Sequence, residues 1–282
     1  MKIDLHMHSA WSDGTDKIEE LLRNVVKNNI SIFALTDHDT IGGCVEIREK
    51  YGNFLKDNKL KFINGIEFST DDSGKSVHIL AYNFDVRNEG MKLLIAKGES
   101  LRKERAEIRL EKLKENFGIE LSPNDRKDLF RANPSKPRIA NILIKMGYKG
   151  TISEIIKKYL DYKLPAYKLT MEETMSGIKK AGGVAVLAHP LGGTGEKEVP
   201  FDEFEERVKK LKACGLDGVG CFYSIYDERQ RQEIQKVAKG LSLKLSGGSD
   251  YHGKSKDVKL AQTSIDGYVP QEKDFTILGT IL

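Results

Sequence analysis

Short apolar runs alternate with longer amphipathic stretches along this chain, and this alternation constrains its fold more than any other feature. The amphipathic stretches carry apolar residues three and four positions apart, as at Ile18, Leu21, Leu22 and Val25, which is helical spacing. Strands that alternate with helices are typical of mostly parallel α/β architectures. The predicted strands are residues 2–6, 31–36, 61–69, 76–84, 184–189, 218–223 and 243–247.

Two segments depart from this alternation. Asp71 and Gly74 lie in a turn-like sequence between the strands that carry Glu67 and His78, which predicts a hairpin. Residues 91–167 show helical periodicity (98–113, 139–146 and 152–160) and no convincing strand. We therefore expect a barrel-like body of residues 1–90 and 168–282 with a helical insertion subdomain at 91–167. The length of 282 residues suits this, since α/β barrels commonly have about 250.

Charge and cysteine content argue against several classes of protein. The 46 basic and 42 acidic residues leave a net charge of +4, too small to predict a nucleic-acid binder from bulk electrostatics. Cys44, Cys214 and Cys221 form no CxxC pair, which favours reduced thiols over a disulfide framework. No signal-like start is present, and no apolar run approaches the roughly 20 residues of a membrane span. We expect a cytoplasmic protein with no membrane association and no obligate protein partner.

All six histidines lie in or just after predicted strands, and none lies on a predicted helix face. Residues two apart on a strand point to the same side, so His6 and His8 can converge on one ion. Functional groups of α/β barrels gather at the C-terminal ends of the strands. The pattern predicts one metal site, and the ionisable residues at these strand ends are His6, His8, Asp13, Asp37, His38, Glu67, His78, His189, Asp250 and His252.

The donor types restrict the metal and the chemistry. Imidazole and carboxylate without thiolate suit zinc, manganese or iron, and they argue against an all-oxygen calcium site. No GxSxG sequence offers a serine nucleophile, and no GxGxxG follows the first strand, so a Rossmann-type cofactor enzyme has no support. We expect two or three divalent transition-metal ions and hydrolysis by a metal-activated hydroxide.

The motifs that carry these residues resemble those of the polymerase and histidinol phosphatase (PHP) superfamily. They are DLHMHS from residue 4, TDHD from 36, GIE from 65, HP from 189 and GGSDYHG from 247, and they occur in the family's order over nearly the whole chain. Sequences around 137–140, 147–148, 165–167 and 181–190 resemble the branch of stand-alone PHP phosphoesterases that act on nucleoside 3′,5′-bisphosphates or, as 5′-to-3′ exoribonucleases, on short RNA.

The resemblance implies a distorted seven-stranded (β/α)7 TIM-like barrel with three metal positions. It assigns His6, His8, Glu67 and Asp250 to one ion. A bridging Glu67 with His78 and His189 would hold a second. The third ion would be held by Asp13, His38 and His252, where many relatives have a histidine in place of Asp13. Two further departures from the branch are Lys136-Pro137-Arg138 in place of Arg-Pro-His, and Gly220 in place of a glutamate.

Other residues are expected to support this site. Asp250, His252 and Asp37 would assist the metal-bound hydroxide, with Asp37 either orienting a histidine ligand or forming a turn. Lys136 and Arg138, on an extended segment between prolines, are expected to bind substrate phosphate. Arg102 and Arg105, at helical spacing, would either line a nucleotide groove or form a solvated face.

The expected reaction is hydrolysis of a phosphomonoester. The substrate would be a small-molecule phosphate ester such as a nucleoside 3′,5′-bisphosphate, or a short oligonucleotide such as 5′-phosphorylated RNA. Two alternatives stay open. The first is a histidinol-phosphate phosphatase, which the helical insertion disfavours. The second is a metal-binding PHP domain without turnover, which the intact ligand set disfavours.

Overall fold

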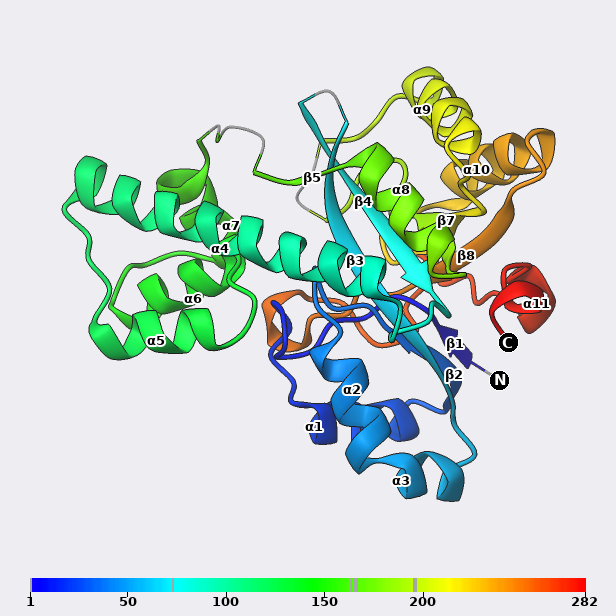
Figure 1. Cartoon of the computed structure of the whole chain (residues 1–282), viewed down its shortest axis with the longest axis horizontal. Coiled ribbons are helices and arrows are strands. Elements are labelled where there is room, and N and C mark those ends of the chain that lie inside the picture. The colour runs from blue at the N-terminus through cyan, green and yellow to red at the C-terminus, as the bar shows by residue number, and fades with distance from the viewer. Residues whose placement is uncertain (1, 73, 163, 165–166, 195–196) are drawn as a thin grey trace.

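A computed structural model describes residues 2–72, 74–162, 164, 167–194 and 197–282. Its strands form one eight-stranded mixed sheet, in which seven follow the order β1-β2-β3-β4-β6-β7-β8 (Figure 1). These seven are β1 (Lys2–Asp4), β2 (Ile30–Leu35), β3 (Lys61–Asp72), β4 (Lys75–Tyr82), β6 (Val184–Leu187), β7 (Gly218–Tyr223) and β8 (Lys244–Gly248). Each was predicted from the sequence.

The first and last strands meet, which closes the sheet. Leu5 N donates a hydrogen bond to Gly247 O at 3.1 Å, and Met7 forms a parallel bridge with Tyr251. The backbones approach so closely that a Cβ on Gly248 would lie 2.3 Å from His6 N, so glycine is required there. The fold is therefore the expected distorted α/β barrel.

Strand β4 runs antiparallel to both of its neighbours in the sheet. β1, β2 and β3 pair in parallel, as do β6, β7 and β8, whereas β4 is antiparallel to both β3 and β6. The β3–β4 pairing extends from Gly65↔Tyr82 to Asp72↔Lys75, which confirms the predicted hairpin. Ser73 of the predicted turn lies outside the described residues. The short β5 (Leu169–Thr170) pairs with β3. It was not predicted, because two residues are too few to show alternation.

Helices cover the barrel and bury its apolar residues. The largest hydrophobic cluster includes Phe68, Ile79, Val186 and Phe222 from the strands and Phe204 from a helix, all buried. A second cluster joins α1 and α2 to β2. The covering helices are α1 (Ile18–Lys27), α2 (Gly42–Lys50), α3 (Gly52–Asp57), α8 (Met171–Lys180), α9 (Phe201–Ala213), α10 (Glu228–Gly240) and α11 (Leu278–Ile281).

Most of the described residues between β4 and β5 are helical. The long α4 (Glu89–Phe117) begins after the Asn88 cap and ends at Gly118, whose φ of 65° terminates it. Its Met91 packs in the barrel cluster, and its Leu113 packs in a third cluster that the following helices share. These helices lie away from the strands in Figure 1. They are α5 (Pro123–Arg131), α6 (Lys136–Lys145), α7 (Ile152–Ile155) and the π-helix η1 (Ile156–Leu160).

The three helices predicted in this segment are present, and the first extends beyond its predicted residues 98–113 at both ends, to Glu89 and Phe117. The division into a barrel and an insertion subdomain stays a prediction, and its first boundary would fall within the first turn of α4. Among the described residues, no helix is both long and apolar enough to cross a membrane.

Candidate metal centre

The barrel brings the six histidines and three of the predicted carboxylates to one place. His6 and His8 follow β1, His38 follows β2, and Asp13 lies in the loop before α1. Glu67 and His78 lie within the hairpin strands β3 and β4, His189 follows β6, and Asp250 and His252 follow β8. The backbone sets this arrangement, because Asp250 N donates to His6 O and His8 N donates to Tyr251 O, each at 2.8 Å.

Glu67 lies at the centre of the group and is 1% exposed. Its Oε2 is 3.0 Å from Nε2 of His6 and 3.0 Å from Nε2 of His8. The same oxygen is 3.4 Å from Nδ1 of His38, without hydrogen-bond geometry. One carboxylate oxygen therefore faces three imidazoles.

The other oxygen of Glu67 faces two further imidazoles. Oε1 is 3.1 Å from Nδ1 of His78 and 3.2 Å from Nε2 of His189. These two ring nitrogens are 3.3 Å apart. Glu67 thus joins two groups of histidines, as a bridging carboxylate would.

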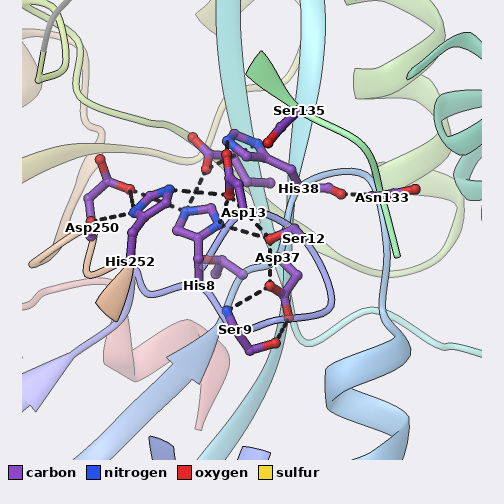
Figure 2. Close-up of polar contacts among 12 residues, drawn as sticks. His8, Ser9, Ser12, Asp13, Asp37, His38, Asn133, Ser135, Asp250 and His252 are labelled. Carbon is purple, nitrogen blue, oxygen red and sulfur yellow. Dashed lines mark hydrogen bonds and ion pairs between the residues drawn. The ribbon is translucent and has the colours of Figure 1, made fainter. Parts of the chain in front are cut away.

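Asp250 and Asp13 complete two sides of the centre. Asp250 Oδ1 is 3.2 Å from His8 Nε2 and 3.5 Å from His6 Nε2. Asp13 Oδ1 is 3.2 Å from His252 Nε2, and its Oδ2 is 3.7 Å from His38 Nε2 (Figure 2). His8 lies between the two aspartates, since its Nδ1 is 3.6 Å from Asp13 Oδ1.

These ligand atoms form three overlapping groups, each compact enough to hold one ion. The groups are His6, His8, Glu67 and Asp250; His8, Asp13, His38 and His252; and His38, Glu67 and His78. His8, His38 and Glu67 each belong to two of these groups, whereas in the expected assignment only Glu67 is shared between two ions.

The residues present fit metal ions. Two ligands about 2.1 Å from a tetrahedral ion lie about 3.4 Å apart, and the distances around Glu67 and Asp13 span 3.0 to 3.7 Å. His6 Nε2 and His8 Nε2 lie only 3.2 Å apart. His38 Nδ1 is buried without a hydrogen-bond partner in the described part of the chain, and a buried unpaired nitrogen is costly unless it binds something. The three free cysteines lie outside all three groups.

The electrostatics favour ionised carboxylates. Burial opposes ionisation of Glu67, but the charges of the surrounding histidines outweigh it and hold the pKa of Glu67 well below its usual value. The pKa values of Asp13 and Asp250 are likewise well below their usual value despite burial, with His38 and Lys256 respectively as the largest opposing causes. Burial lowers the pKa of His38 and His252, whereas Asp250 and Glu67 raise the pKa of His8 to about 10 despite its burial, so His8 would lose its proton on binding a metal. Ionised carboxylates and neutral imidazoles are the forms that bind metals.

Backbone contacts orient several ligands. His252 Nδ1 lies 2.8 Å from the carbonyl oxygen of Asp250, so its N–H donates there and its Nε2 lone pair faces Asp13. Asn133, after α5, donates from Nδ2 to His38 O at 2.8 Å, and its N–H donates to Trp11 O at 3.1 Å. Figure 2 shows Asn133 beside His38, where residues after α5 meet the metal centre.

Asp37, expected among the supporting groups, is buried and holds the loop that follows β1. It accepts hydrogen bonds from Ser9 N at 2.8 Å, Ser9 Oγ at 2.7 Å and Ser12 Oγ at 2.6 Å. Ser12 Oγ in turn lies 3.5 Å from His8 Nδ1. The contacts of Asp37 therefore reach a histidine through Ser12.

Several polar residues at the centre were not predicted. Lys256 Nζ is 2.6 Å from Asp250 Oδ2, and Tyr223 OH donates to the same oxygen at 3.0 Å. Asp4 is buried and accepts hydrogen bonds from Ser249 and Ala261, which fastens β1 to the segment after β8. Lys256 lies in an irregular loop with no periodicity to mark it. Asp4 was quoted only as part of the DLHMHS motif.

The four expected substrate residues have different surroundings. Arg102 pairs with Asp39 at 2.7 Å and is buried, whereas Arg105 donates to Tyr167 O at 3.0 Å. Lys136 pairs with Asp161 at 3.4 Å. Arg138 donates to three backbone carbonyls, those of Ala10, Ser12 and Asp128, at 3.3, 3.1 and 2.9 Å. Arg102 thus lies in neither a solvated face nor an open groove, and phosphate binding by all four stays a prediction.

A cavity of about 500 Å³ opens beside the centre. Its lining includes His78, His189, Ser76, Lys75 and Arg207. Of the six histidine side chains, that of His78 is the most exposed, at 17%. The cavity therefore gives access to the side of the centre that holds His78 and His189, and its volume is that of a small-ligand site.

Comparison with known proteins agrees with this geometry. A family model described as the PHP domain matches residues 4–122. The 5′-3′ exoribonuclease of Haemophilus influenzae is 31% identical over 259 residues, which cover 89% of this chain and 90% of that protein. The 3′,5′-nucleoside bisphosphate phosphatase of Chromobacterium violaceum is 27% identical over 263 residues, which cover 89% of this chain and 87% of that protein.

A solved structure shares the whole fold. A Bifidobacterium adolescentis protein described as a metal-dependent phosphoesterase superimposes with a TM-score of 0.80 and 28% identity, over 94% of this chain and 93% of that one. The expected family is thereby confirmed. This chain belongs to the PHP family and is a metal-dependent phosphoesterase.

Proposed function

We propose that this enzyme removes a phosphate from nucleotides, with nucleoside 3′,5′-bisphosphates or short 5′-phosphorylated RNA as substrates. The observation that carries the proposal is the convergence of five histidines on the single carboxylate of Glu67, beside a cavity large enough for a nucleotide. The name of the Haemophilus influenzae relative refers to RNA and that of the Chromobacterium violaceum relative to nucleoside bisphosphates, which supports this substrate class.

We assign the ligands to three ions. His6, His8, Glu67 and Asp250 form one compact group and would hold the first ion. The contacts of His78 and His189 with Glu67 Oε1 support a second ion that shares Glu67 with the first. Asp13, His38 and His252 would hold a third. The ligand types suit manganese, zinc or iron.

Two or three divalent ions, when bound, lower the pKa of a bound water and neutralise phosphoryl oxygens. The chain's own residues prepare the site for this. Lys256 and Tyr223 occupy Oδ2 of Asp250, so that Oδ1 faces His6 and His8. His78 and His189 line the cavity, so a substrate that enters there meets their side of the centre first.

A metal analysis with a phosphate-release screen tests this proposal. We expect at least two transition-metal ions per chain and faster phosphate release from adenosine 3′,5′-bisphosphate than from histidinol phosphate or p-nitrophenyl phosphate. Fewer than one ion per chain, with no activity restored by added manganese or zinc, would contradict the metal assignment. Preference for histidinol phosphate would favour that alternative, and metal binding without any turnover would favour a non-catalytic domain.

A further inference from the structure

Three cations lie together between α4 and β5, and we call Arg105, Arg109 and Lys168 the cation cluster. Arg105 and Arg109 are four residues apart on α4 and therefore share a face of the helix. Burial, followed by the charges of Arg105 and Arg102, lowers the pKa of Lys168 to about 8. Burial, followed by the charge of Arg102, lowers the pKa of Arg105 to about 9. The cations are thus close enough to repel one another.

The carboxylates nearest the cation cluster, Asp39 and Asp71, raise the pKa of Lys168 but form no ion pair with the cluster among the described residues. Neighbouring Arg102 pairs with Asp39, but within the described ranges none of the three clustered side chains forms an ion pair. Arg105 and Arg109 donate to backbone carbonyls, and Arg109 Nε is buried without a hydrogen-bond partner among the residues that the structure describes. Arg105 is only 7% exposed. A buried cation is costly unless an anion pairs with it, so the cluster is arranged to receive an anion.

The cation cluster adjoins the cavity beside the metal centre. Lys168 Nζ donates to Ser76 Oγ, and Ser76 lines the cavity together with His78. Ser76 and His78 are two residues apart on β4, so they share a face of the strand and lie roughly 7 Å apart along it. An anion at Lys168 would therefore lie next to a phosphate held at His78 and His189.

We infer that the cation cluster binds a second, non-reacting phosphate of the substrate. This inference rests on the proposed nucleotide phosphatase activity and selects nucleotides that carry phosphates at two positions of the ribose. Lys136 and Arg138 do not offer the same opportunity, because Lys136 has Asp161 as a partner and Arg138 donates to three carbonyls. Charge-assisted hydrogen bonds to phosphate are about twice as strong as neutral ones, so each clustered cation contributes appreciably to affinity.

Kinetics of the metal-loaded enzyme test the inference with Arg105→Gln and Lys168→Gln. We expect kcat/KM for adenosine 3′,5′-bisphosphate to fall about tenfold or more in each, chiefly through KM. Activity on p-nitrophenyl phosphate, which has no second phosphate, and metal content should stay within about twofold of wild type. The matched control is Lys103→Gln, because Lys103 is exposed on α4 and its removal takes away the same charge.

The salt dependence and the conservative variants give independent measurements. Each lost phosphate contact should reduce the slope of log(kcat/KM) against log[salt] for the bisphosphate, because salt screens the attraction between the cations and the phosphate. Lys168→Arg should restore both the rate and the slope. If Arg105→Gln fails to fold, Lys168→Gln decides alone, since the described partner of its side chain is the hydroxyl of Ser76.

The outcomes separate this inference from the proposed function. Equal losses on both substrates, no loss on the bisphosphate, or a wild-type enzyme that hydrolyses nucleotides without preferring two phosphates would overturn the cation cluster as a phosphate site. A wild-type enzyme that hydrolyses p-nitrophenyl phosphate but no nucleotide would instead overturn the proposed substrate class, and the cluster with it.

Discussion

The metal centre and the cation cluster both bury charged side chains, but the metal centre would bind cations and the cation cluster would bind an anion. The metal centre holds Glu67, Asp13 and Asp250 with six histidines, so its lone pairs point inward at one another. The cation cluster holds Arg105, Arg109 and Lys168 without an ion pair among the described residues. The first arrangement requires cations and the second requires an anion.

This difference indicates how the two regions would cooperate on a substrate. Metal ions neutralise the phosphate that reacts, and the cation cluster would neutralise a phosphate that does not react. Arg102 forms an ion pair with Asp39, the residue that directly follows His38 in the chain. We expect the paired Arg102 to stabilise the fold and the unpaired cations to bind a ligand, and the predictions below test that distinction.

Replacing Glu67 with glutamine should have the largest effect. Glu67 faces five histidines and is the proposed bridge between two ions, so Glu67→Gln should lose both ions. Replacing a residue that only supports a metal ligand lowers activity by up to about a hundredfold. The loss of activity in Glu67→Gln should be larger than this. Elemental analysis and phosphate release measure these effects. Exposed Glu89→Gln on α4 is the control, and retention of both ions would refute the bridging role.

Arg102→Met should destabilise the protein strongly. It leaves Asp39 buried without its cation, which costs about 3–5 kcal/mol. Among the described residues Arg105 forms no ion pair, so Arg105→Met leaves no carboxylate without a cation and removes a buried charge that has no counterion. We therefore expect the free energy of unfolding to change by under about 1 kcal/mol. Urea denaturation compares the two free energies of unfolding. Equal losses would mean that the paired and unpaired arginines do not differ.

Arg138→Ala should weaken the third ion. Arg138 donates to Ala10 O and to Ser12 O. Ser12 directly precedes Asp13, so Arg138 positions a proposed metal ligand. A supporting residue of this kind contributes about tenfold to hundredfold to metal affinity. Titration of chelated protein with manganese should show one weakened ion, while exposed Arg131→Ala leaves all ions unchanged. Loss of bisphosphate preference with intact metal binding would instead make Arg138 a phosphate ligand.

The smallest expected effect is a change with pH. Burial and the charges of Arg105 and Arg102 lower the pKa of Lys168 to about 8, whereas the charges of Asp71 and Asp39 oppose this shift. Only protonated Lys168 attracts phosphate, so the ratio of kcat/KM for adenosine 3′,5′-bisphosphate to that for p-nitrophenyl phosphate should fall severalfold as pH rises above 8. Lys168→Arg should remove this fall. A ratio that is flat with pH in wild type would exclude Lys168 from phosphate binding.

The sequence predicted the barrel and the gathering of histidines because both follow from local periodicity. His6 and His8 two apart, and Asp250 and His252 two apart, mark strand ends that a parallel sheet brings together. Glu67 and His78 were found because an ionisable residue interrupts an apolar strand in each case. The roles of these residues as ligands remain proposals.

Pairings between distant segments could not be read from the sequence. Arg102 and Arg105 occupy equivalent places in the helical pattern of α4, yet one meets Asp39 and the other meets Tyr167 O. Lys256 reaches Asp250 from an irregular loop, and Asn133 reaches His38 O across 95 positions. Such contacts depend on how loops pack over the barrel, which periodicity does not determine.

Anomalous diffraction from crystals grown with manganese tests the central claim most directly. We predict at least two peaks around Glu67, the first within about 2.0–2.3 Å of His6, His8 and Asp250 and the second near His78 and His189. A third peak is expected beside Asp13, His38 and His252. A single peak, or peaks that do not touch Glu67, would contradict a multinuclear centre built on this carboxylate.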